Sequence, residues 1–100
     1  MKPNVTCFVY DRKGNLLSVG RNSYVKTHPI QAKAAKAVGQ DQRIYLHAEI
    51  HALVQIKDWD DAYKINVVRY GSNGEPLNAA PCEICTYVIK QTGIKRIEHT

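Results

Sequence analysis

The sequence predicts an α/β fold with a mixed β-sheet and its elements in the order β-β-α-α-β-α-β. Two strand-like segments open the chain and are joined by turn-forming residues, which is typical of a β-hairpin. Each of the two later strand-like segments follows a helix-like one, so crossover connections and partly parallel pairing are expected. One hundred residues are the usual length of one domain, and we expect residues 1–100 to form a single domain.

The first two strands are predicted at residues 5–10 and 16–21, where apolar and β-branched residues are frequent. The segment between them contains Gly14-Asn15 among other turn formers, which favours a hairpin connection. Cys7 lies within the first apolar strand pattern. We interpret it as a buried thiol that packs as a small hydrophobic group.

Two helices are predicted next, at residues 29–38 and 47–57. Pro29 suits a first helical turn, Gly39 suits a helix end, and the alanines and lysines between them favour helix. We expect this first helix to cover the sheet or to border a pocket. The second helix has a buried stripe at helical spacing, formed by Ile50, Leu53 and Val54.

The remaining predicted elements are a strand at residues 64–70, a loop at 71–76, a helix at 81–91 and a strand at 94–99. The strands alternate apolar and polar residues more than strands covered on both faces usually do. The polar positions are Thr6, Ser18, Asn66 and Arg69. We therefore expect the helices mainly on one face of the sheet. The other face is expected to be wet, thinly covered or shielded by another subunit.

The composition excludes a membrane-spanning segment, because no apolar run approaches the length needed to cross a bilayer. No signal-peptide pattern opens the chain, so a cytoplasmic location is expected. The formal net charge of +5 is compatible with an anionic substrate such as a nucleotide. Three cysteines are an odd number, which favours a metal-binding or redox role for the Cys-x-x-Cys pair over a structural disulfide.

Two short motifs carry the chemistry, His47-Ala48-Glu49 and the later Pro81-Cys82-Glu83-Ile84-Cys85. One histidine and two cysteines can hold zinc and leave its fourth position open for water. Each motif opens a predicted helix, and helix N-termini favour the thiolates that zinc needs. Glu49 is a carboxylate that can move a proton beside such a water, which favours a hydrolytic over a structural zinc site.

Three other interpretations of these motifs are a redox pair, a structural zinc site and chance occurrence. A redox-active Cys-x-x-Cys is expected after an N-terminal strand, whereas Cys82 and Cys85 come late in the chain. A structural zinc site would need a fourth ligand, and His51 is four residues from His47 on the same helical face. That arrangement would leave Glu49 without a role, so His51 is expected to pack or hydrogen-bond near the site. Chance occurrence is disfavoured because both motifs occur in order, separated by one strand.

The pattern His-x-Glu followed by Pro-Cys-x-x-Cys resembles the signature of the zinc-dependent nucleoside and nucleotide deaminases. Gly20-Arg21-Asn22 and residues 93–97 also look like segments of that family, so the resemblance covers most of the chain. It implies a cytidine-deaminase-like fold that here lacks the usual first helix and the C-terminal helix and strand. It also implies that Asn22 contacts the sugar or base of the substrate.

The resemblance implies hydrolytic deamination, in which zinc-bound hydroxide attacks the carbon bearing the exocyclic amine and Glu49 shuttles protons. A cytosine nucleotide such as deoxycytidylate is the expected substrate. Substrate contacts are expected from Asn22, the Ala48 backbone, the peptide at Pro81 and, less strongly, His28. The candidates for holding a phosphate are Arg21, Lys26, Lys33 and Lys36.

Two alternatives remain open at this point. The first is a deaminase that acts on cytosine or adenine in single-stranded DNA or RNA, because Tyr24 and Tyr45 flank the predicted pocket and can stack on bases. The second is a catalytically silent zinc module that binds a partner. In each case we expect a homo-oligomer without a membrane partner, because the core is small and one sheet face lacks a covering layer.

Overall fold

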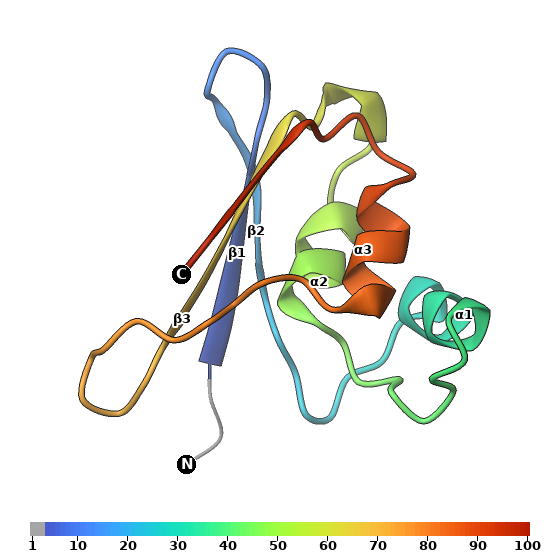
Figure 1. The fold of residues 1–100 in the computed structure, drawn as a ribbon. Coiled ribbons are helices and arrows are strands. Elements are labelled where there is room, and N and C mark those ends of the chain that lie inside the picture. The colour runs from blue at the N-terminus through green and yellow to red at the C-terminus, as the bar shows by residue number, and fades with distance from the viewer. Residues whose placement is uncertain (1–3) are drawn as a thin grey trace.

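The computed structural model describes residues 4–100, in which a four-stranded sheet carries its helices on one face (Figure 1). The strand order is β2-β1-β3-β4, with β1 at Asn4–Tyr10, β2 at Leu16–Arg21, β3 at Lys64–Tyr70 and β4 at Arg96–His99. β1 pairs antiparallel with both β2 and β3, whereas β3 and β4 are parallel. The mixed α/β sheet and the order of the elements along the chain are therefore confirmed.

The helices are α1 (Pro29–Ala37), α2 (Ala48–Val54) and α3 (Glu83–Ile89), with a short 3-10 helix, η1 (Trp59–Asp61), after α2. α2 packs directly on β1 and β2, and α3 packs beside α2. α1 contacts α3 and α2 and lies farthest from the sheet (Figure 1), which corrects the expectation that it covers the sheet. None of the helices between residues 4 and 100 has the length and apolarity that a membrane crossing requires.

The core lies between the sheet and the layer formed by α2 and α3. It is built from alternate residues of the central strands and from the inner helix faces, and its members include Cys7, Val9, Ile50, Leu53, Ile65, Val67, Ile84 and Val88. Because successive strand residues point to opposite faces, Thr6, Phe8 and Tyr10 lie on the other side of β1. These three side chains are only partly buried, and no described helix covers them (Figure 1).

The helices are shorter than the sequence predicts, and hydrogen bonds explain where α2 stops. The Leu53 carbonyl accepts the indole N–H of Trp59 at 2.7 Å and the backbone N–H of Ile56 at 3.1 Å. In a longer α-helix this carbonyl would accept the N–H of Lys57 instead. α3 likewise spans seven residues rather than 81–91, and β4 begins at Arg96 rather than at 94.

Candidate metal centre and cavity

Two helix starts bring the chemically active side chains together. His47 is the N-cap residue of α2 and Cys82 is the N-cap residue of α3, each with extended backbone angles. Cys85 lies one turn further along α3 and is fully buried. Because α2 and α3 are neighbours above the sheet, the two motifs meet in space although 35 residues separate His47 from Cys82.

The geometry of this cluster fits a zinc ion. The Nδ1 atom of His47 lies 3.3 Å from the Cys85 sulfur and 3.4 Å from the Cys82 sulfur. A tetrahedral zinc with bonds of roughly 2.0 Å to nitrogen and 2.3 Å to sulfur separates such ligand atoms by about 3.5 Å. All three ligand atoms lie within 4.8 Å of one another, so one ion can reach them together.

His51 is engaged elsewhere. Its Nδ1 atom accepts the backbone N–H of Arg21 at 2.9 Å, which ties α2 to the end of β2. Within residues 4–100, the cluster that could hold a metal contains His47, Cys82 and Cys85 and does not include His51. The three side chains would leave one position of a tetrahedral ion open, as catalytic zinc sites do.

A hydrogen bond between the Cys82 and Cys85 side chains shifts their two pKa values in opposite directions. The pKa of Cys82 is lowered to about 3, chiefly because its sulfur accepts a hydrogen bond from the Cys85 thiol and secondarily through His47. The pKa of Cys85 is raised, because it donates that bond and because it is buried. The pKa of His47 is raised in turn by its hydrogen bond to Cys82. A metal ion that binds both sulfur atoms displaces the proton of the hydrogen bond between them.

Glu49 provides a carboxyl group beside the metal cluster. It is the second residue of α2, is 6% exposed and lines the same cavity as His47 and Cys82. The pKa of its carboxyl is raised, above all because burial disfavours the charged form. A raised pKa lets a carboxyl group hold a proton more readily than an exposed carboxyl does, which suits a group that takes up and returns a proton.

The cavity has a volume of about 560 Å³, within the roughly 300–1,000 Å³ that is usual for small-molecule sites. Asn22 and the buried Ala48 both line it. The Oδ1 atom of Asn22 accepts the backbone N–H of Val5 at 2.9 Å, which fixes the side chain at the end of the hairpin. Tyr24 and Tyr45 line the same cavity from two loops and are partly exposed.

Two of the proposed substrate contacts lie outside the lining of this cavity. His28 is the N-cap residue of α1, where its Nδ1 atom accepts the backbone N–H of Ile30 at 3.1 Å. Pro81 precedes the metal ligand Cys82 and is partly exposed. Neither residue belongs to the described cavity wall.

The basic residues that line the cavity differ from those that the sequence analysis proposed as phosphate-binding residues. None of Arg21, Lys26, Lys33 and Lys36 lines the cavity, whereas Arg43 and Arg69 do. A signal for Arg69 was present, because it continues the alternation of the buried Ile65 and Val67 and so shares their face of β3. Arg43 lies in an irregular loop, where the sequence carries no comparable periodic signal.

Gln31 is another residue that the sequence reasoning missed. It is fully buried on α1, and its Nε2 atom donates to the Arg43 carbonyl at 3.1 Å. Its Oε1 atom accepts the backbone N–H of His47, also at 3.1 Å. Gln31 shares the buried face of α1 with Ala34 and Ala35, so its helical spacing could have marked it as an inward amide.

Comparison with known proteins agrees with this site. Residues 1–99 match the family described as the cytidine and deoxycytidylate deaminase zinc-binding region. A search of curated proteins finds no significant match. The family match and the His-Cys-Cys cluster together identify zinc as the cofactor. With nearly the whole chain matched, the protein belongs to the cytidine and deoxycytidylate deaminase family.

Proposed function

We propose that the protein hydrolytically deaminates the cytosine of a nucleotide such as deoxycytidylate. The observation that carries this proposal is the buried carboxyl of Glu49, which lines one cavity with His47 and Cys82. When bound by His47, Cys82 and Cys85, zinc would leave one position for a water molecule and lower its pKa. A purely structural zinc site has no need of a neighbouring acid or base.

In the proposed reaction Glu49 moves protons between the water and the substrate. Hydrolysis replaces the exocyclic amine by an oxygen from water and releases ammonia. The carboxylate of Glu49 takes a proton from the water, and its carboxyl form delivers that proton toward the departing amine. Asn22 and the Ala48 backbone border the cavity and are proposed to orient the base and sugar.

The proposal is tested by comparing Glu49→Gln with the parent protein and with Glu83→Gln. Glu83 is an exposed carboxyl at the start of α3, as Glu49 is a buried one at the start of α2. We expect Glu49→Gln to lose roughly 10²–10⁴-fold in ammonia release from deoxycytidylate, because that is the usual contribution of a proton-transferring side chain. Zinc content and circular dichroism should stay unchanged, and Glu83→Gln should keep most of the activity. Unchanged ammonia release by zinc-loaded Glu49→Gln would contradict the mechanism.

A polynucleotide substrate is the second candidate. Tyr24 is 40% exposed and Tyr45 is 51% exposed, and both line the cavity from neighbouring loops. The loops are joined by a bridge between Thr27 and Tyr45. Aromatic side chains at a cavity mouth can stack on the bases beside a flipped nucleotide. Faster ammonia release from a cytosine-containing oligonucleotide than from the mononucleotide would favour this candidate.

A zinc module without catalytic activity is the remaining alternative. It predicts that the zinc-loaded parent protein releases no ammonia from any nucleoside, nucleotide or single-stranded oligonucleotide. Screening cytosine, adenine and guanine compounds of each type therefore separates a deaminase of altered substrate from a silent binding module.

A further inference from the structure

Arg69 carries a polar atom whose partner is missing from the described chain. Its Nε atom is buried and has no hydrogen-bond partner within residues 4–100. Buried N–H donors are nearly always paired, so an exception at a cavity wall calls for an acceptor from outside the chain. The backbone of Arg69 is already occupied, with its N–H bonded to the Thr100 hydroxyl at 3.0 Å and its carbonyl to the same group at 3.3 Å.

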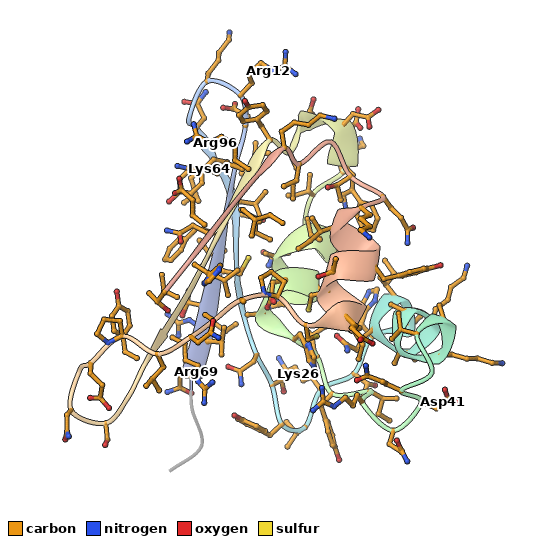
Figure 2. The ribbon with its side chains drawn as sticks, viewed as in Figure 1. Arg12, Lys26, Asp41, Lys64, Arg69 and Arg96 are labelled. Atoms are coloured by element: carbon orange, nitrogen blue, oxygen red, sulfur yellow. The ribbon has the colours of Figure 1, made fainter. Side chains whose placement is uncertain are left out.

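The register of the sheet directs Arg69 to the site. Arg69 is opposite Val5 in the antiparallel pairing of β1 and β3, and Asn22 in turn bonds the Val5 backbone. Asn22, Val5 and Arg69 therefore form a row across three neighbouring segments of the sheet, and all three line the cavity. Figure 2 shows Arg69 and Lys26 at one end of the molecule, whereas Arg12, Lys64 and Arg96 gather at the other.

The two arginines of the cavity wall have no carboxylate partner among the described residues. These arginines are Arg43 and Arg69, and the carboxyl group of the wall belongs to Glu49. The ion pair found within residues 4–100 joins Lys64 to Glu98, so neither arginine of the cavity is paired with a carboxylate. An arginine guanidinium presents donors in a planar fork that matches the oxygens of a phosphate.

We infer that Arg69, assisted by Arg43, binds a phosphate ester on the sugar of the substrate. The inference rests on the proposed function, because it assumes that a nucleobase occupies the metal end of the same cavity. It assigns Arg69 and Arg43 as the residues that make the protein prefer a phosphorylated substrate to the free nucleoside. The phosphate can be the terminal group of a mononucleotide or the diester of a polynucleotide, and the two sources are separated by experiment.

The arginine side-chain N–H signals provide a direct test that does not depend on turnover. Zinc-loaded Glu49→Gln protein is titrated with deoxycytidine, with deoxycytidine 5′-monophosphate and with a cytosine-centred trinucleotide that lacks terminal phosphates. The Arg69 Nε–Hε signal is assigned by its loss in Arg69→Lys. We expect this signal to shift with the phosphorylated ligands and not with deoxycytidine. The ligand that shifts it at the lower concentration identifies the source of the phosphate.

Dissociation constants provide the matched comparison. We expect Arg69→Gln to weaken binding of the preferred phosphorylated ligand about tenfold to a hundredfold, the usual effect of losing a charged hydrogen bond. Arg43→Gln should weaken it less, and deoxycytidine binding should change little in either variant. The control is Arg96→Gln, which removes an exposed arginine at the opposite end of the sheet (Figure 2).

Two outcomes would overturn the inference. The first is equal binding of nucleoside and phosphorylated ligands by the parent protein. The second is an unchanged preference in Arg69→Gln. Failure of the proposed reaction gives a different result, in which no ammonia is released although the Arg69-dependent preference persists. Deamination that is equally fast for nucleoside and nucleotide would leave the reaction standing and contradict the phosphate site.

Discussion

Gln31 is the residue on which two parts of the site depend. Its amide oxygen accepts the His47 N–H and its amide nitrogen donates to the Arg43 carbonyl; the Gln31 side chain is fully buried, and the two bonds are partly buried. A buried polar group that loses its partner costs about 1–3 kcal/mol. Gln31 therefore stabilises the loop that leads to the metal ligand, and we regard it as a positioning residue for His47.

Replacing Gln31 by leucine should affect folding and metal binding together. Leucine fills a similar volume but cannot make either hydrogen bond, so the Arg43 carbonyl and the His47 N–H both lose their partner. We expect a loss of about 2–4 kcal/mol in the free energy of unfolding. We also expect weaker zinc binding, because the His47 backbone loses its support. Chemical denaturation and competition with a zinc chelator measure the two effects.

The matched control for Gln31 is Gln91→Leu, because Gln91 is exposed and its amide bonds only the Tyr87 carbonyl in the interactions described. This control should leave stability and zinc affinity nearly unchanged. Equal zinc affinities for Gln31→Leu and the parent protein would show that Gln31 supports the fold alone and would remove its positioning role.

The site residues that the sequence predicts differ in kind from those that it does not predict. His47, Glu49, Cys82 and Cys85 form local motifs whose spacing carries the chemistry. Arg69 acts through cross-strand register, since its neighbour in space is Val5 on another strand. The alternation with Ile65 and Val67 predicts which face of β3 Arg69 is on, but the pairing with Val5 is set by the packing of the whole sheet and cannot be read from the sequence near Arg69.

At the scale of elements, the contact of β2 with α2 determines where the metal ligand sits. Gly20 is buried on β2, and a Cβ atom there would meet the Ala48 carbonyl and the Ala52 backbone nitrogen. Those atoms belong to the backbone of α2 and cannot rotate away. Ser18 reinforces the contact, because its hydroxyl donates to the Ala52 carbonyl at 2.8 Å.

We therefore expect Gly20→Ala to displace α2 from the sheet and to lower the free energy of unfolding by about 1–3 kcal/mol, the usual cost of overpacking. Zinc affinity should fall as well, because His47 and Glu49 move with the start of α2. Gly71→Ala is the control, since the Cβ atom there would meet the flexible Glu75 side chain. Urea unfolding that is identical for Gly20→Ala and the parent protein would contradict the close approach.

The first and last residues of an element were predictable where turn-forming residues flank it in the sequence. The Leu16–Arg21 and Lys64–Tyr70 strands were predicted at the observed bounds, because turn residues flank them on one or both sides. The end of α2 was not predictable, because the indole of Trp59 reaches back to the Leu53 carbonyl. A hydrogen bond of that kind depends on the folded path of the chain after the helix.

At the scale of the whole molecule, the two faces of the sheet are unequal. The helices cover one face, while the opposite face presents Phe8 and Val19 side by side in the register of β1 and β2, with Val68 on β3 (Figure 1). All three side chains are partly exposed. A hydrophobic strip of this kind is a suitable surface for a second copy of the chain.

We propose that the protein forms a homodimer through this open face and expect light scattering at micromolar concentrations to give twice the mass of the chain. Val19→Lys should shift the mass to that of a monomer, because it places a charge in the strip. Val25→Lys is the control, since Val25 is 82% exposed on a loop away from the sheet. A parent protein that is monomeric over the whole micromolar range would contradict this prediction.

The contacts made by Gln31 also bear on how the protein could acquire a new substrate. Gln31 bonds the main chain at positions 43 and 47, and main-chain atoms are common to almost every residue type. These two bonds are therefore independent of the side chain that position 43 carries. Substitution there can alter the ligand preference of the cavity while the metal ligand keeps its place, so selectivity and catalytic chemistry can evolve separately on this scaffold.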